Sequence, residues 1–191
     1  SSAASDVYKR QTSRPGVIGM TKRITISILD AMKASGDKFV MITAYDATFA
    51  RLASEAGAET ILVGDSLGMV LQGHETTIPV SLDAMAYHTE CVARARPHSL
   101  IVADLPFMSF SNSDDTLHAS TRLMQAGAQM VKLEGGTWLS DSIHRLVERG
   151  VPVCAHLGLT PQSVNVFGGY RVQGRTPKEA KSILADAVDC L

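Results

Sequence analysis

Apolar and polar positions follow a repeating pattern along this chain. Short apolar runs, typical of buried strands, occur at 39–43, 60–63, 99–103, 129–133 and 151–155. Longer stretches between them begin at helix-capping residues and end at glycine, which is typical of helices. The pattern therefore predicts five strands that alternate with helices, with one further helix ahead of the first strand and another after the last.

Capping residues predict where each helix begins. We expect N-caps at Thr25, Asp46, Ser81, Ser113 or Asp114, and Thr176. The helix from Thr25 should end at Gly36, and another helix should run from Thr137 to Arg149. Thr176 is followed by Pro177 and by Glu179, the arrangement of a capping box. Two connections, 69–79 and 157–175, show no period and are expected to be loops.

Strands that alternate with helices through short turns predict right-handed βαβ units and a parallel sheet. The strands are apolar throughout, as in a sheet covered on both faces. A barrel and a doubly wound sheet both satisfy this pattern. The barrel better explains why polar residues end five successive strands, since those ends meet at one mouth. Five strands cannot close an eight-stranded (β/α)8 TIM barrel, so we expect 21–191 to be a truncated portion of one.

Both ends of the chain depart from this pattern. Residues 1–20 show neither a helical nor a strand period and lack the apolar core of a signal peptide. We therefore expect this stretch to be a non-native or disordered tail. The helix that begins at Thr176 stops without a closing glycine, so the chain is expected to be cut there.

Composition narrows the class of protein. With 45% hydrophobic residues and a net charge of −1, the chain is typical of a globular protein, and no basic excess points to nucleic acid. No apolar stretch approaches the roughly 18 residues of a membrane-spanning helix. The three cysteines show no CxxC spacing and are expected to be reduced thiols in a cytoplasmic protein.

Three carboxylates follow strand-like runs: Asp65, Asp104 and Glu134. Carboxylate oxygens without HExxH or clustered cysteines favour Mg²⁺ over zinc. Lys132 lies two positions before Glu134, so both side chains point to the same side of their strand and suit an anionic, metal-chelating substrate. Simpler alternatives are that each acid caps a helix or turn, and that Lys132 and Glu134 form a structural ion pair. His156 ends the fifth strand and either orients a ligand or is a buried structural histidine.

A competing hypothesis is a serine hydrolase. The stretch 64–68 matches GxSxG, and Ser66, Asp104 and His156 occur in the order of a catalytic triad. Such a nucleophile elbow requires a helix directly after the serine, whereas 68–79 is glycine-rich and polar. We therefore expect no helix there, which weighs against the hydrolase. The chain has no Walker loop and no GxGxxG motif, so nucleotide binding has no support.

From about Ile24 onwards the chain resembles the ketopantoate hydroxymethyltransferase family of the phosphoenolpyruvate/pyruvate barrel superfamily. Matching blocks include VGDSLGM at 63–69, ADLPFM at 103–108 and VKLEGG at 131–136. Further blocks lie at 43–46, 72–74, 79–80, 86–88, 156–163 and 167–170. So many blocks in the same order are far more specific than any single motif.

The resemblance implies a site and a reaction. Asp65, Asp104 and Glu134 would surround Mg²⁺, with the two aspartates as direct ligands. The 2-oxo acid would be bound by Asp65, Ser66, Asp104 and Lys132. The family transfers a hydroxymethyl group from 5,10-methylenetetrahydrofolate to 3-methyl-2-oxobutanoate through a Mg-stabilised enolate, giving 2-dehydropantoate for pantothenate biosynthesis. Its members are homo-oligomers, typically decamers.

The resemblance also implies that the chain is incomplete. The family's catalytic base is a glutamate on the sixth strand, beyond Leu191, so no catalytic residue is carried over. General-base catalysis is worth about 10²- to 10⁴-fold, so this chain is expected to be nearly inactive alone. Its open sheet edges predict aggregation. Three hypotheses therefore remain: a one-carbon transferase, a serine hydrolase, and a fragment that binds ligand or nothing without turnover.

Overall fold

A computed structural model describes residues 23–190, and the predicted tail at 1–20 lies outside these residues. Within them, five parallel strands form one sheet in the chain order β1-β2-β3-β4-β5. The strands are β1 (Met41–Thr43), β2 (Thr60–Val63), β3 (Leu100–Asp104), β4 (Met130–Glu134) and β5 (Val153–His156). The predicted fold class is confirmed, since an all-parallel sheet in chain order is the arrangement of consecutive units of a TIM barrel.

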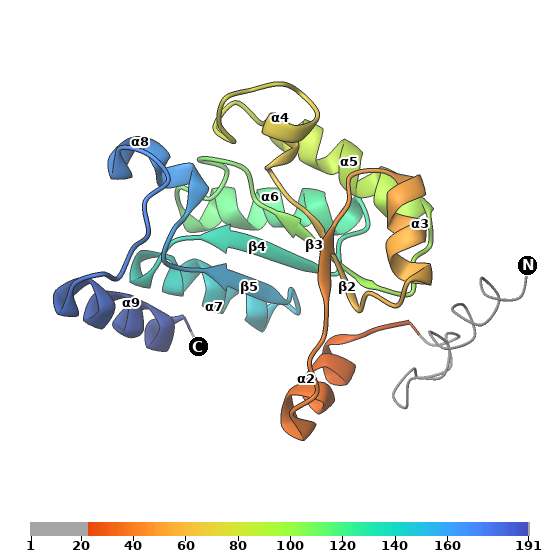
Figure 1. Ribbon diagram of the computed structural model, residues 1–191, viewed down its shortest axis with the longest axis horizontal. Coiled ribbons are helices and arrows are strands. Elements are labelled where there is room, and N and C mark those ends of the chain that lie inside the picture. Colours follow the sequence, from red (N-terminus) through yellow and green to blue (C-terminus); the bar gives the residue numbers. More distant parts are fainter. Residues whose placement is uncertain (1–22, 191) are drawn as a thin grey trace, which may run out of the picture.

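Helices connect consecutive strands, as the alternating pattern predicted (Figure 1). They are α2 (Ile26–Ser35), α3 (Ala47–Glu55), α4 (Leu67–Val70), α5 (Leu82–Arg94), α6 (Ser113–Gln125), α7 (Ser140–Glu148), α8 (Val164–Phe167) and α9 (Pro177–Asp189). Two single-turn 3₁₀ helices, η1 (Thr137–Leu139) and η2 (Pro161–Ser163), complete the set. Within residues 23–190, no helix is both long and apolar enough to cross a lipid bilayer.

The predicted helix starts are confirmed for most helices. The Asp46 carboxylate accepts hydrogen bonds from the amides of Thr48 and Phe49, and Thr176 forms the predicted capping box with Glu179. One cap was predicted wrongly, because α6 is capped by Asn112, whose side chain accepts from the amide of Asp115. The predicted helix from Thr137 is divided into η1 and α7. The two predicted loops contain the short helices α4, η2 and α8, which are too brief to produce a hydrophobic period.

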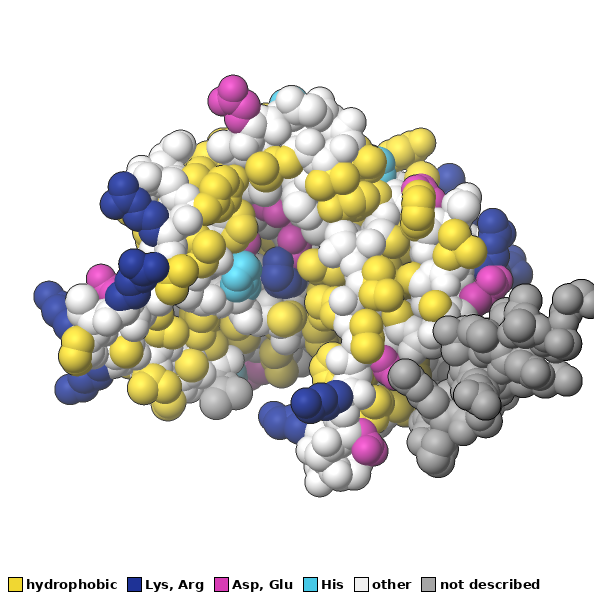
Figure 2. Space-filling model, in the orientation of Figure 1, with side chains coloured by type: hydrophobic (Ala, Val, Ile, Leu, Met, Phe, Trp, Pro, Cys, Tyr) yellow, Lys and Arg dark blue, Asp and Glu magenta, His cyan; other side chains and the backbone are white. Residues whose placement is uncertain are grey.

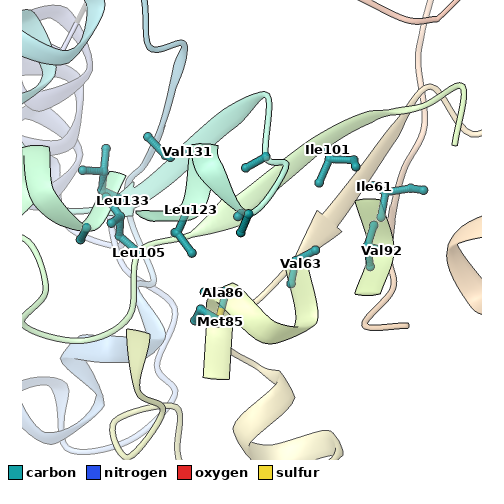
Figure 3. Close-up of a cluster of buried hydrophobic side chains, with 14 of the residues drawn as sticks. Ile61, Val63, Met85, Ala86, Val92, Ile101, Leu105, Leu123, Val131 and Leu133 are labelled. Atoms are coloured by element: carbon teal, nitrogen blue, oxygen red, sulfur yellow. The ribbon is translucent and has the colours of Figure 1, made fainter. Parts of the chain in front are cut away.

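The two faces of the sheet pack against different helices. On the outer face, Ile61, Val63, Ile101, Val131 and Leu133 are fully buried against the helices (Figure 3). On the inner face, Leu100 and Val102 pack with Leu29 of α2, which covers the sheet near the amino ends of its strands (Figure 1). Alternate positions of each strand therefore serve two separate cores.

The expectation that every strand is covered on both faces is wrong for the outer strands. All three residues of β1 are exposed, with Met41 at 42% and Ile42 at 39%. Only one residue of β5 is exposed, and none of its residues is fully buried. These strands lie at the two edges of the sheet, where they have a neighbour on one side only. An apolar sequence therefore predicted the strand but not its exposure.

Candidate functional site

The register of the parallel sheet gathers polar residues at the carboxyl ends of the strands. Asp104 is the register partner of Lys132, and Glu134 is the register partner of His156. Asp65 and Ser66 follow β2 at the same end. Figure 2 shows acidic, basic and histidine side chains gathered in a hollow on this face, with hydrophobic side chains around it. The strand ends therefore bring together residues that are far apart in the sequence.

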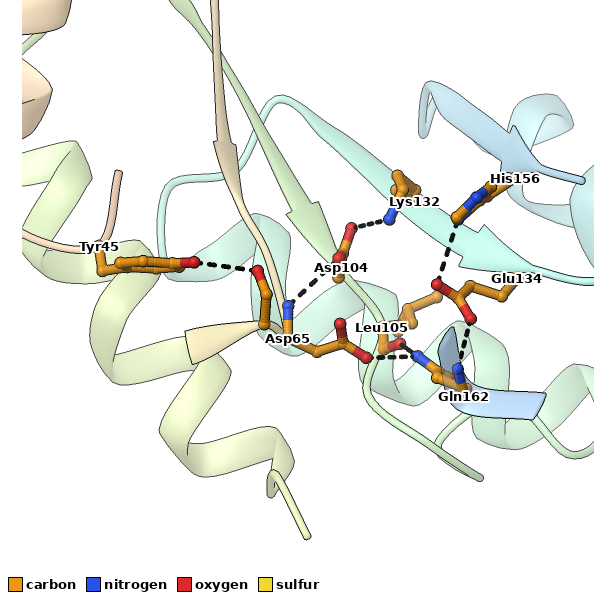
Figure 4. A network of polar contacts seen from close by, with 9 residues as sticks. Tyr45, Asp65, Asp104, Leu105, Lys132, Glu134, His156 and Gln162 are labelled. Atoms are coloured by element: carbon orange, nitrogen blue, oxygen red, sulfur yellow. Dashed lines mark hydrogen bonds and ion pairs between the residues drawn. The ribbon is translucent and has the colours of Figure 1, made fainter. Parts of the chain in front are cut away.

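Asp65 and Asp104 are in direct contact and almost fully buried, at 3% and 4% exposure (Figure 4). The backbone amide of Asp65 donates to Asp104 Oδ2 at 3.2 Å. Lys132 Nζ donates to the other oxygen, Oδ1, at 2.6 Å, which makes a largely buried ion pair. Of the predicted residues, the structure thus joins Asp65, Asp104 and Lys132 into one contact network.

Glu134 lies beside this pair and is held by two donors. Its Oε1 is 3.1 Å from Nδ1 of His156, and its Oε2 accepts from the backbone amide of Gln162 at 2.9 Å. His156 contacts Glu134 and not the aspartates. Both oxygens of the glutamate are therefore engaged by neighbouring residues.

Ser66 is oriented by a tyrosine that the sequence analysis did not single out. The hydroxyl of Tyr45 is 2.9 Å from Ser66 Oγ, and Nδ1 of His88 lies 2.8 Å from the backbone oxygen of Tyr45. His88 was not predicted to contact the site. The only sequence signal for Tyr45 was its place in the block at 43–46 that matches the family, and this match gave no chemical role to the tyrosine.

Gln162 is the second residue that sequence reasoning missed. It lies on η2, in a stretch predicted to be loop, and its side chain contacts Asp65 97 positions away. No periodicity or motif spacing links two residues across such a separation. The signal available was again its membership of a matching block, 156–163.

The electrostatics of the cluster reflect burial and crowded acids. Burial, and then the charge of Asp104, raises the pKa of Asp65 to about 6, against a lowering contribution from Gln162. Burial also raises the pKa of Asp104, although Lys132 opposes this effect. The pKa of Lys132 is raised because its carboxylate neighbours outweigh its burial, so its ammonium stays protonated at neutral pH. The cluster therefore holds more negative charge than it can compensate.

The expectation that Asp65, Asp104 and Glu134 together surround Mg²⁺ stays a prediction. Among residues 23–190, no three or more His, Cys, Asp and Glu side chains are grouped so that they could hold a metal ion. Glu134 directs its two oxygens to His156 and Gln162, and Asp104 likewise directs its two oxygens to Lys132 and to the amide of Asp65. Asp65 and Asp104 are buried adjoining carboxylates whose repulsion a divalent cation would relieve.

The contacts of Ser66, Asp104 and His156 contradict the hydrolase hypothesis, whereas the argument made against it from the sequence was wrong. A helix does follow Ser66 directly, because α4 begins at Leu67, so the expectation of no helix there was wrong. However, Ser66 bonds to Tyr45, Asp104 to Lys132 and His156 to Glu134. A serine triad requires the histidine to bond both the serine and the aspartate. The three residues are therefore not arranged as a triad.

Comparison with known proteins points to one family. The family described as ketopantoate hydroxymethyltransferase matches residues 23–190. The chain is 57% identical over 180 residues to 3-methyl-2-oxobutanoate hydroxymethyltransferase of Burkholderia vietnamiensis, covering 94% of this chain and 64% of that protein. It is 59% identical over 168 residues to the protein of the same name from Colwellia psychrerythraea, covering 88% and 63%. The chain thus spans about 64% of the length of the curated relatives that it matches.

Solved structures show similarity of fold. Phosphonopyruvate hydrolase, determined as a complex with oxalate and Mg²⁺, superposes with a TM-score of 0.59 at 18% identity, covering 83% of this chain and 66% of that one. A 2,3-dimethylmalate lyase of the PEP mutase/isocitrate lyase superfamily gives a TM-score of 0.60 at 16% identity, covering 85% and 57%. Both likenesses support the barrel architecture deduced from the sheet.

Proposed function

Because this chain belongs to the ketopantoate hydroxymethyltransferase family, we propose that it carries the oxo-acid-binding part of that family's active site. The whole enzyme would transfer a hydroxymethyl group from 5,10-methylenetetrahydrofolate to 3-methyl-2-oxobutanoate, giving 2-dehydropantoate for pantothenate biosynthesis. The observation that carries the proposal is the buried contact between Asp65 and Asp104 beside Lys132. Cytoplasmic location and homo-oligomeric assembly, as a decamer, belong to the same proposal.

In this proposal Asp65 and Asp104 hold Mg²⁺, and Glu134 lies next to them without being a direct ligand. The ion, when bound, would withdraw electrons from the substrate carbonyl and acidify the adjacent C–H. The donor set supports this choice because hard carboxylate oxygens suit Mg²⁺. It is also supported by the raised pKa of Asp65, which reflects first its burial and then the charge of Asp104, and a bound cation would offset both effects.

The charges of the site suit a 2-oxo acid. The three carboxylates of Asp65, Asp104 and Glu134 and the ammonium of Lys132 leave a net negative charge in the cluster, which a divalent cation would neutralise. The carboxylate of a substrate would then meet the cation and Lys132 without an excess of negative charge. Lys132 supplies the fixed cation, and the Ser66 hydroxyl, held by Tyr45, supplies a donor that orients the substrate.

We assign no catalytic base among the described residues. Glu134 lies beside the proposed cation, with its oxygens bonded to His156 and to the amide of Gln162, and is not assigned as the base. Asp65 and Asp104 are assigned to the cation. The proton on the carbon next to the carbonyl would be removed by another group of the whole enzyme.

The direct experiment is calorimetric titration of 3-methyl-2-oxobutanoate into this chain with and without Mg²⁺. Binding is expected only with the metal. Lys132→Met should weaken it about tenfold or more, since a hydrogen bond to a charged group is lost. The matched control is Asp114→Asn, because that side chain is 93% exposed and distant in function from the site.

Three outcomes would contradict the proposal. If 3-methyl-2-oxobutanoate binds without metal and binds equally well to the Lys132→Met variant, its binding site does not lie in this cluster. Covalent labelling of Ser66 by a fluorophosphonate would support the hydrolase instead. A chain that binds neither Mg²⁺ nor 3-methyl-2-oxobutanoate would leave only the hypothesis of a non-catalytic fragment.

The proposal also makes a prediction for a full-length relative. Deuterium exchange at C3 of 3-methyl-2-oxobutanoate, measured by NMR, is expected to depend on the metal.

A further inference from the structure

One buried glutamine joins the ends of three strands. Gln162 is 6% exposed, and its side-chain Nε2 donates to Asp65 Oδ2 at 2.8 Å and to the backbone oxygen of Leu105 at 2.9 Å. Its backbone amide donates to Glu134. Figure 4 shows the glutamine between these groups, which lie at the ends of β2, β3 and β4. A turn after β5 therefore contacts each strand end that carries a predicted acid.

The contacts leave one orientation for the side-chain amide. Asp65 Oδ2 and the Leu105 oxygen are both acceptors, so only the NH₂ group can face them. Both of its N–H donors are then used. Because the amide is fixed at two points, it also fixes the rotation of the Asp65 carboxylate. Among the described residues no hydrogen bond reaches the second oxygen of Asp65, so that oxygen can accept a cation.

We propose that Gln162 is a positioning residue that sets the Asp65 carboxylate in the orientation needed to bind a divalent cation. The inference rests on the proposed function, since it presumes that Asp65 and Asp104 receive the cation. Partners that bond to a metal ligand typically change metal affinity by 10- to 100-fold when they are removed. Gln162 contacts a proposed ligand in this manner.

A purely structural role would predict something different. The bond from the Gln162 backbone amide to Glu134 holds η2 in place and does not depend on the side chain. Thr160, in the same turn and also 6% exposed, bonds only to Ser163 and does not reach the carboxylates. The two side chains thus separate support of the turn from support of Asp65.

The test uses Mn²⁺ alone as probe, with free ion measured by electron paramagnetic resonance. Gln162→Met keeps the length of the side chain and removes both donors, and it should weaken Mn²⁺ binding about tenfold or more. Thr160→Val should stay within about twofold of the parent chain. Equal affinity of Gln162→Met and the parent, or equal losses in both variants, would overturn the proposal.

A second measurement does not depend on the metal. Thermal unfolding of Gln162→Met, Asp65→Ala and the double variant, with a chelator present, forms a double-mutant cycle. A coupled pair should depart from additivity by about 2 to 4 °C, and additive shifts would overturn the proposed contact. If the parent chain binds no Mn²⁺, the proposed function fails, while this cycle still decides whether Gln162 governs Asp65.

Discussion

At the scale of single residues, Asp65 lies where burial and a neighbouring carboxylate disfavour its ionised form. Asp65 is almost fully buried beside a second carboxylate, and its pKa rises to about 6 for those reasons. At neutral pH the folded chain therefore bears the cost of ionising it. Asp104 differs because Lys132 forms an ion pair with it at 2.6 Å, although burial still raises its pKa. The two aspartates should respond oppositely when their charge is removed.

Asp65→Asn is expected to stabilise the metal-free chain at pH 7. The amide keeps an acceptor for Gln162 and removes the buried charge, so unfolding should cost about 1–3 kcal/mol more, on the scale of a shift to a pKa of about 6. Asp104→Asn should instead destabilise the chain by about 3 kcal/mol, because it leaves Lys132 unpaired. Urea unfolding with a chelator measures both. Equal losses of stability would show that the cluster is not short of positive charge.

Tyr45→Phe is expected to weaken 3-methyl-2-oxobutanoate binding about two- to tenfold, the worth of one hydrogen bond. The lost hydroxyl contacts Ser66 and not the aspartates, so the affinity for Mn²⁺ should be unchanged. The control is Tyr170→Phe, whose hydroxyl makes only a 3.6 Å contact to the sulfur of Met69. A parallel loss of both ligands would mean that Tyr45 acts through the fold.

The sequence predicted the charged residues at the strand ends but not the residues that form hydrogen bonds with the groups there. Asp65, Asp104, Lys132 and Glu134 could be placed at one end of the sheet because parallel strands end together. The contacts made by Tyr45 and Gln162 could not, because each joins residues from elements separated by many positions. The direction of the Glu134 carboxylate depends on such a contact with Gln162, which the sequence did not indicate.

At the scale of elements, α9 is attached to the rest of the fold by side-chain contacts to η1. The backbone amide and the hydroxyl of Thr137 both donate to Asp186, and the hydroxyl also bonds Asp189. No residue of α9 is buried, so apolar packing contributes little. These bonds hold the pKa of Asp186 below its usual range.

Thr137→Val is therefore expected to lower the melting temperature at pH 7 by about 1–3 °C. Since the pKa of Asp186 is lowered in the folded chain, the contact stabilises the chain above the ordinary aspartate pKa. Its contribution is lost as the pH falls through the lower folded value, so the difference should shrink below about pH 4. Thr121→Val, which removes a hydroxyl bonded within α6, is the control. A difference that does not change with pH would contradict the assignment to Asp186.

The long elements were predictable and the short ones were not. Asp46, Ser81 and Thr176 each have a capping geometry that depends on neighbouring residues only, so the local sequence sufficed. In contrast, α4 and α8 are four residues long and carry no complete hydrophobic period. Their conformation depends on packing against distant parts of the chain.

At the scale of the whole molecule, the sheet formed by residues 23–190 ends at two outer strands, β1 and β5. The stretch 39–42, which runs into β1, exposes its apolar side chains at 39% or more. Exposed edge strands pair readily with other chains. The sequence predicted this hazard from the number of strands, although it did not show how much of β1 would be accessible.

Met41→Lys is expected to reduce self-association by about fivefold or more, since it places a charge on the exposed edge. Sedimentation velocity over a range of concentrations measures the association constant. Leu184→Lys is the matched control, because Leu184 is 68% exposed on α9, away from this edge. If both changes reduce association equally, general surface hydrophobicity and not strand pairing is responsible.

The cross-strand pairing of Asp104 with Lys132 has a consequence for folding as well. Side chains alternate between faces, so two neighbouring strands could slip by two residues and still keep their apolar faces inward. Such a slip of β3 against β4 would place Lys132 opposite Val102 and leave its buried ammonium without the Asp104 carboxylate. The ion pair between Asp104 and Lys132, which is proposed to bind the substrate, therefore also sets the register of β3 against β4. It disfavours a shifted pairing that hydrophobic burial alone would allow.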